Sequence, residues 1–145
     1  AIKKLISEEE TKYINLKQIQ NFLNCEICDR IKNAKFVDKE RAFCINVKME
    51  EFKNNEVAVQ GIIDLYFIDR NDKLVILDYK TDQAINPEIY YGQQSCYRKA
   101  VSEMYNIPVE KIKTYLYYTR FDKTVDISQN TLQNPDFSLL TIEDN

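Results

Sequence analysis

The chain has 145 residues, of which 44% are hydrophobic and 30% charged, and this length and composition predict one globular domain with a single core. No apolar run approaches the roughly 20 residues of a membrane span, and the start AIKKLISEEE lacks the apolar region of a signal peptide, so we expect a cytoplasmic protein that does not bind membranes. The net charge of −3 argues against tight autonomous binding of nucleic acid, and the lack of histidine excludes Ser-His-Asp and Cys-His catalysis.

Helical signals occupy the first part of the chain. Ser7 and Glu10 have the spacing of a capping box, and apolar residues recur at helical spacing over 16–23. Asn24 is a candidate N-cap of a second short helix, which would turn Cys28 toward the core. Because no further ligands follow the Cys-x-x-Cys at 25–28 with zinc or iron–sulfur spacing, we expect reduced, partly buried thiols there.

The pattern then changes to that of strands. Residues rich in β-branched and aromatic side chains predict strands over 42–49, 56–69 and 73–80. The sequence DRND at 69–72 has the composition of a turn, so the second and third strands should form an antiparallel hairpin.

The second half of the chain is expected to continue with a helix and further strands. Asn86-Pro87 is a helix start signal, and the helix should run to about Tyr105. A strand is expected over 114–119 and an edge strand near 124–127. The whole order predicts an α/β fold with a mixed, mostly antiparallel sheet flanked by helices.

Charged residues lie near the ends of the predicted hairpin strands, in GIIDLY (61–66) and ILDYKT (76–81). A hairpin that turns at Asn71 places Asp64 opposite Asp78, with Cβ atoms roughly 4.5–5.5 Å apart, whereas a shift of one residue moves them to opposite faces. Strict alternation of side chains predicts two sets, each on one face. These sets are Gln60, Ile62, Asp64 and Tyr66 on one strand, and Leu74, Ile76, Asp78 and Lys80 on the other.

Two carboxylates at that distance repel each other unless a cation lies between them. Oxygen ligands suit Mg²⁺, with Mn²⁺ as a substitute. Lys80 is placed to stabilise developing negative charge or to orient a water, so the set favours metal-assisted hydrolysis of a phosphodiester. A surface salt-bridge cluster is the alternative that the spacing leaves open.

The predicted helix adds two polar residues. Gln93 and Tyr97 are four residues apart and share a face, although an ordinary helix rim would show the same spacing. The residues expected to form most of the core stripe beside them are Ile89, Cys96, Ala100, Val101 and Met104.

In this order and spacing, Gly61-Ile-Ile-Asp64, Asp78-Tyr-Lys80-Thr-Asp82 and Gln93-x-x-x-Tyr97 resemble the motifs of the RecB-like nuclease module of the PD-(D/E)XK superfamily. The stretch Lys39-Glu40-Arg-Ala-Phe43 resembles the R-E-x-x-F entry to the first core strand in AddA-type subunits. The likeness covers roughly residues 15–120 and is strongest to the C-terminal nuclease domain of bacterial AddA-like ATP-dependent helicase–nuclease subunits. It implies a restriction-endonuclease-like core.

The resemblance also implies roles for single residues. Asp64 and Asp78 are the expected metal ligands, together with the backbone carbonyl of Tyr79, and Lys80 is the expected catalytic lysine. The residues expected to support the site or contact DNA are Gln93, Tyr97, Glu40, Thr81 and Asp82. Among them, Glu40 is expected to act at the strand entry or behind the ligands rather than on the metal.

One feature of the family is missing. RecB-like nucleases usually carry a metal-ligating histidine on a helix upstream of the Gly-x-x-Asp strand, and this sequence has no histidine. Either residues 1–145 are a single partial domain without that helix and without the helicase half, or the site is degenerate. On the first interpretation, the isolated chain has weak activity or none. The lack of cysteine beyond Cys96 argues against the branch that binds an iron–sulfur cluster.

The expected function is therefore that of a Mg²⁺-dependent DNA exonuclease domain in a bacterial helicase–nuclease complex that processes double-strand breaks for recombinational repair. The implied partners are DNA, the helicase portion of the same polypeptide and a second, AddB-like subunit. Two alternatives stay open: a catalytically degenerate scaffold or DNA-guiding domain of the same fold, and a free-standing phage or plasmid exonuclease.

Overall fold

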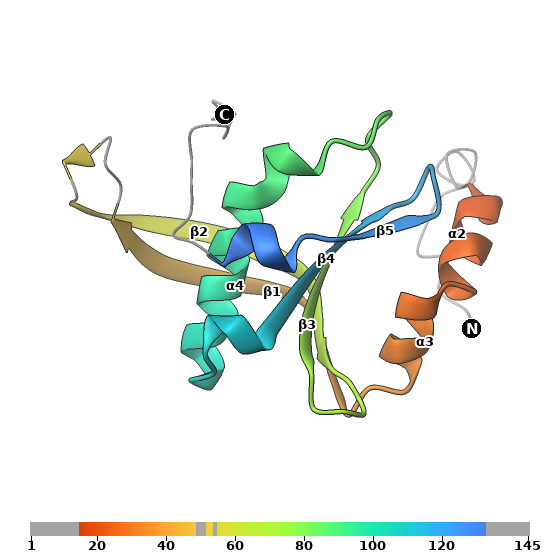
Figure 1. Ribbon diagram of the computed structural model, residues 1–145, viewed down its shortest axis with the longest axis horizontal. Coiled ribbons are helices and arrows are strands. Elements are labelled where there is room, and N and C mark those ends of the chain that lie inside the picture. Colours follow the sequence, from red (N-terminus) through yellow and green to blue (C-terminus); the bar gives the residue numbers. More distant parts are fainter. Residues whose placement is uncertain (1–14, 49–51, 54, 133–145) are drawn as a thin grey trace, which may run out of the picture.

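The computed structural model describes residues 15–48, 52–53 and 55–132, which form one mixed sheet with helices on both faces (Figure 1). The helices are α2 (Leu16–Leu23), α3 (Glu26–Lys32) and α4 (Tyr91–Tyr105), and the strands are β1 (Phe36–Lys48), β2 (Glu56–Ile68), β3 (Leu74–Lys80), β4 (Ile112–Tyr118) and β5 (Lys123–Asp126). The described part of the chain also contains the 3-10 helices η2 (Pro87–Tyr90), η3 (Val109–Lys111) and η4 (Ser128–Thr131). None of the described helices is long and apolar enough to cross a membrane.

The sheet has the strand order β1-β2-β3-β4-β5. Only β3 and β4 are parallel, and α4 forms the crossover between them; the other three pairs are antiparallel. Helices α2 and α3 lie on one side of the sheet and α4 lies on the other (Figure 1). The predicted α/β fold with a mixed, mostly antiparallel sheet is thus confirmed, as is the edge strand near the end of the described chain.

The sheet buries an apolar cluster on each face. The cluster under α4, called the α4-side cluster here, consists of Ile63, Tyr66, Leu74, Ile76, Tyr97, Val101 and Ile112. The cluster on the other face, the α3-side cluster, consists of Ile27, Leu65, Phe67, Val75, Leu77 and Tyr117. Because β3 contributes to both clusters, it is covered on both faces, which explains its almost continuous apolar sequence.

The β2–β3 hairpin has the register expected from the sequence. Leu65 pairs with Leu77 and Ile68 pairs with Leu74. Continuing that register by one step places Asp64 against Asp78, at the end of the hairpin away from its turn. The predicted hairpin is therefore confirmed, and both acidic residues lie where β2 and β3 begin to separate.

Several local expectations were wrong or lie outside the described residues. Asn24 is the C-cap of α2, and Cys25 is the N-cap of α3, because the two helices are separated by only two residues. Ile89 and Met104, at the two ends of the α4 region, are 40% and 38% exposed rather than part of its core stripe. The capping box at Ser7–Glu10 falls outside the described part of the chain. Cys28 is buried, as expected.

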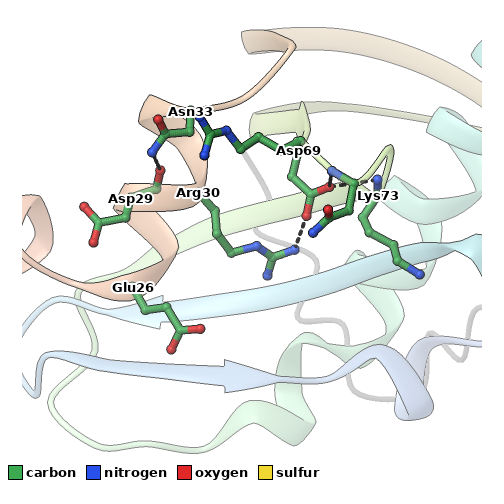
Figure 2. Close-up of a pocket in the computed structure, with 8 residues that line it drawn as sticks. Glu26, Asp29, Arg30, Asn33, Asp69 and Lys73 are labelled. Carbon is green, nitrogen blue, oxygen red and sulfur yellow. Dashed lines mark hydrogen bonds and ion pairs between the residues drawn. The ribbon is translucent and has the colours of Figure 1, made fainter.

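The turn between β2 and β3 is held by a buried carboxylate. Asp69 accepts hydrogen bonds from the backbone N–H groups of Asn71 and Lys73, and from the guanidinium of Arg30 at 2.9 Å. These residues line a pocket of about 520 Å³ between α3 and the turn, in which Arg30 points at Asp69 (Figure 2). Burial acts to raise the pKa of Asp69, but the N–H of Lys73 and the charge of Arg30 outweigh it and lower the pKa below its ordinary value.

This shift predicts acid sensitivity. Because the folded protein holds the Asp69 pKa below its unfolded value, the stabilisation is complete above the unfolded pKa and is lost as pH falls through the folded value. Asp69→Asn should lower the free energy of unfolding by about 1–3 kcal/mol at pH 7 and flatten its decline below pH 4. Urea unfolding between pH 3 and 7 measures both, with the exposed Asp72→Asn as the control. An unchanged acid slope in Asp69→Asn would show that other groups cause it.

Candidate active site

The two acidic residues meet where the β2–β3 ladder ends. The last regular pair is Leu65 with Leu77, and beyond it Oδ2 of Asp64 accepts a hydrogen bond from the N–H of Tyr79 at 3.1 Å. The Asp64 side chain thus takes the place that a backbone carbonyl would have in a continued ladder. This contact ties β2 to β3 and keeps the Asp64 carboxylate beside Asp78.

Asp78 is buried, because only 3% of the residue is exposed to solvent. Burial, together with a hydrogen bond to Asp64, raises the pKa of Asp78 to about 7 against the opposing effect of Lys80. Its Oδ2 forms a close ion pair with Nζ of Lys80 at 2.5 Å. A buried carboxylate beside a second, half-buried one is the electrostatic arrangement that a bound cation stabilises.

The alternation of side chains along β2 changes at this point, which corrects one expectation. Gly61 and Ile63 face α4, as does Tyr66, whereas Leu65 belongs to the α3-side cluster. Ile62, between Gly61 and Ile63, is 58% exposed and points away from α4, so it does not share a face with Tyr66 as strict alternation predicted.

The irregularity has a counterpart in the neighbouring strand β1. Glu40 has a φ of 51°, in the left-handed region that is unusual for a non-glycine residue. The pairs on either side of it are Lys39 with Leu65 and Arg41 with Ile63, so Glu40 lies opposite Asp64 across the ladder. The Glu40 side chain is exposed. The two strands therefore change face together, directly beside the acidic pair.

Lys80 ends β3 and points into the same group of residues. Its side chain is 12% exposed, so its ion pair with Asp78 is not a surface salt bridge. Nζ of Lys80 also donates a hydrogen bond to Oε1 of Gln93 at 3.3 Å, and it lies 3.7 Å from the centre of the Tyr90 ring. Asp64, Asp78, Lys80 and Gln93 are therefore brought together from two strands and one helix.

Tyr97 lies one helical turn beyond Gln93 and is buried, not placed on a helix rim. Its ring packs edge-on against Phe43 of β1 with centroids 5.4 Å apart. Burial raises its pKa, and the nearby charges of Asp78 and Asp64 act in the same direction. Tyr97 is thus a member of the α4-side cluster that lies near the acidic pair, and the ring of Phe43 packs against it.

Gly61 is required by the same packing. A Cβ atom at this position would lie 2.8 Å from the Phe43 ring and 3.5 Å from the Tyr97 ring. Gly61→Ala is therefore expected to displace the Phe43 ring and lower the free energy of unfolding by about 1–3 kcal/mol. Denaturant unfolding measures this, and Phe43→Leu in the same background should recover part of the loss. Equal stability of Gly61→Ala and the wild type would contradict the close packing.

The loop after Lys80 is fixed by several contacts. Oδ2 of Asp82 accepts a hydrogen bond from the Tyr90 hydroxyl at 2.6 Å, and the Thr81 carbonyl accepts one from Nε of Arg120 at 2.8 Å. Thr81 is exposed and Asp82 is half-buried. These two hydrogen bonds hold the chain where it leaves β3.

The donor set suits an oxygen-preferring divalent cation, although it is small. Asp64, Asp78 and the carbonyl of Tyr79 are the candidate ligands, and Mg²⁺ often binds one or two carboxylates and keeps several waters. No group of three or more His, Cys, Asp or Glu side chains with metal-site geometry occurs within the described ranges. The 520 Å³ pocket in Figure 2 lies at the opposite end of the hairpin and contains none of these residues.

Tyr90 is the residue in this site that the motifs did not reveal. It lies at the junction of η2 and α4, three positions before Gln93. Aromatic residues are frequent in this chain, with ten tyrosines, so composition offered no reason to single it out. Only the tertiary structure shows its ring against Lys80.

Comparison with known proteins agrees with the motifs. Residues 3–142 match the PD-(D/E)XK nuclease superfamily. The chain is 35% identical over 136 residues to an ATP-dependent helicase/nuclease subunit of Alkaliphilus oremlandii, covering 85% of this chain and 11% of that protein. It is 33% identical over 127 residues to the protein of the same name from Lysinibacillus sphaericus, covering 79% and 10%. For that of Clostridium acetobutylicum the identity is 30% over 131 residues, covering 81% and 10%.

The chain spans about a tenth of the length of these relatives. The likeness therefore concerns one module of a larger protein, and it includes the strands and the helix that carry the candidate site. The mixed sheet with helices on both faces is consistent with the restriction-endonuclease-like core implied by the sequence motifs. By its match over almost the whole sequence, the chain belongs to the PD-(D/E)XK nuclease superfamily.

Proposed function

We propose that the chain is a Mg²⁺-dependent deoxyribonuclease domain that hydrolyses phosphodiester bonds as part of a helicase–nuclease. The observation that carries the proposal is the meeting of Asp64, Asp78 and Lys80 at one end of β3, with two carboxylates and one ammonium largely shielded from water. The names of the relatives support the wider context, because each is a component of an ATP-dependent helicase/nuclease.

Each residue of the site would have a distinct role in phosphodiester hydrolysis. Asp64, Asp78 and the Tyr79 carbonyl would hold the divalent cation, which when bound activates a water and neutralises phosphate charge. Lys80 would donate hydrogen bonds to the phosphate oxygen on which charge develops. Gln93 would hold the Lys80 ammonium in place, and Tyr97 would exclude water behind the carboxylates.

The biological setting completes the proposal. The domain would degrade DNA during the processing of double-strand breaks for recombinational repair in the bacterial cytoplasm. Its partners would be the helicase portion of the polypeptide and a second, AddB-like subunit. The net charge of −3 supports this division, because a domain with little positive charge would rely on other parts of the complex to hold DNA.

Asp64→Ala in the helicase–nuclease polypeptide tests the function. We expect DNA degradation to fall by at least a hundredfold while ATP-driven unwinding continues, because unwinding does not use the carboxylates. Asp72→Ala, an exposed acidic change in the β2–β3 turn, is the matched control and should leave degradation unchanged.

A scaffold or DNA-guiding role is the second candidate. It is favoured by the small donor set, since a third acidic, histidine or cysteine ligand is not found in the described part of the chain. Undiminished degradation by the Asp64→Ala protein would exclude the proposed nuclease function and leave this second candidate.

A further inference from the structure

Three groups contact the ammonium of Lys80. Asp78 is also a candidate metal ligand, whereas Gln93 and Tyr90 are not. Asp78 lies 2.5 Å from Nζ, Gln93 accepts its hydrogen bond at 3.3 Å, and the Tyr90 ring centre is 3.7 Å away. Asp78 cannot anchor Lys80 alone if its carboxylate also binds a divalent cation, because both positive groups compete for the same oxygens. The ring of Tyr90 is neutral and attracts the ammonium without competing for the metal.

The position of the Tyr90 ring is fixed by its backbone and by its hydroxyl. Tyr90 ends η2, which begins at Pro87, and it is the N-cap of α4, so its backbone is held by two consecutive helices. Its hydroxyl donates a 2.6 Å hydrogen bond to Asp82, which lies in the loop two residues after the end of β3. Burial and this hydrogen bond raise the pKa of Tyr90, which keeps the hydroxyl protonated as the donor.

We propose that Tyr90 is a second positioning residue for Lys80 beside Gln93, and that Asp82 acts on the site through the Tyr90 hydroxyl. The inference rests on the proposed nuclease function of Lys80. The Tyr90 ring keeps the ammonium at the end of β3 when the Asp78 carboxylate binds a divalent cation. Asp82 therefore sets the rotation of the ring rather than binding DNA.

The contact itself is measured on the isolated chain, without any need for activity. An ammonium above the face of an aromatic ring places the neighbouring Hε protons of Lys80 in the ring current, so their NMR signals should be shifted upfield from those of exposed lysines. Tyr90→Leu should return the Lys80 signals to the ordinary lysine position, whereas Tyr90→Phe should keep most of the shift. Unshifted Lys80 signals in the wild type would overturn the inference.

Tyr91→Leu is the matched control. Both tyrosines pack against the same apolar group of Leu116, Tyr118 and Ile127, but only Tyr90 lies against Lys80. Any general loosening of this region should therefore appear in both leucine variants, and only Tyr90→Leu should move the Lys80 signals. Equal movement in both variants would show a structural effect and contradict the positioning role.

The consequence for the reaction is measured in the same helicase–nuclease polypeptide as Asp64→Ala. We expect Tyr90→Leu to lower kcat for DNA cleavage about tenfold with KM changed by less than twofold, and Tyr90→Phe to lose about threefold or less. If Lys80→Met abolishes cleavage while Tyr90→Leu cleaves at the wild-type rate, the inference about Tyr90 fails alone. If Lys80→Met also cleaves normally, the proposed function fails.

A double-mutant cycle tests the role of Asp82. Asp82→Ala and Tyr90→Phe each remove one end of the same hydrogen bond, so their effects on kcat should be similar and the double variant should be no worse than either single variant. Fully additive losses would overturn the statement that Asp82 acts through the Tyr90 hydroxyl.

Discussion

Calorimetric titration of Mn²⁺ into the wild-type chain is expected to show saturable binding, and Asp64→Ala and Asp78→Ala should each abolish it. The reason is that both carboxylates lie at one end of the β2–β3 hairpin, where Asp78 is buried and Asp64 is held beside it by the N–H of Tyr79. Removal of either carboxylate leaves one acidic ligand, which is too little to compete with hydration of the ion.

The same experiment has a thermal readout. A ligand that binds only the folded state stabilises it by about 2.7 kcal/mol at a concentration one hundred times its dissociation constant. Mn²⁺ should therefore raise the Tm of the wild type and of the exposed control Asp72→Asn, but not that of Asp64→Ala or Asp78→Ala. Equal Tm increases in all four proteins would place the ion elsewhere on the chain.

Arg98→Met is expected to cause the largest loss of stability in the chain, about 3–5 kcal/mol. Arg98 follows Tyr97 on α4 and is only 1% exposed, yet it forms no ion pair with a described residue. Its guanidinium donates hydrogen bonds to the carbonyls of Val109 and Ser128 and to the Thr131 hydroxyl. Methionine fills much of the space but leaves these buried acceptors without a donor.

Denaturant unfolding of three variants tests this expectation. Arg98→Lys keeps the charge but cannot reach all three acceptors from one ammonium, so its loss should be about half that of Arg98→Met. Arg70→Ala removes an exposed arginine from the β2–β3 turn and should change the free energy of unfolding by less than about 0.5 kcal/mol. Wild-type stability of Arg98→Met would mean that η3 and η4 do not depend on this side chain.

The sequence was sufficient for the core elements, because their signals are local. Alternating and continuous apolar patterns located β2 and β3, and the DRND turn between them predicted both the hairpin and its register. Asn86-Pro87 predicted the start of the α4 region, although the first turn is the 3-10 helix η2. The motifs also named the acidic pair that the hairpin brings together, because a register fixes which residues lie opposite each other.

The errors arose where one part of the chain acts on another. Strict alternation failed at Asp64 because β1 and β2 change face together, and the left-handed Glu40 that accompanies this change has no signature in sequence. Asn24 looked like an N-cap because short polar residues favour both ends of helices, and only the packing of α2 against α3 decided which end it occupies.

Local patterns in the sequence therefore predicted the class of fold and the register of the central hairpin, and they named Asp64, Asp78, Lys80 and Gln93 as one candidate group. The tertiary structure alone decided that Asp78 is buried, that Tyr90 lies against Lys80 and that Arg98 holds η3 and η4 to α4. The physical reason is that strand and helix periods are set by neighbours along the chain, whereas burial and contacts between distant segments depend on how the helices pack on the sheet.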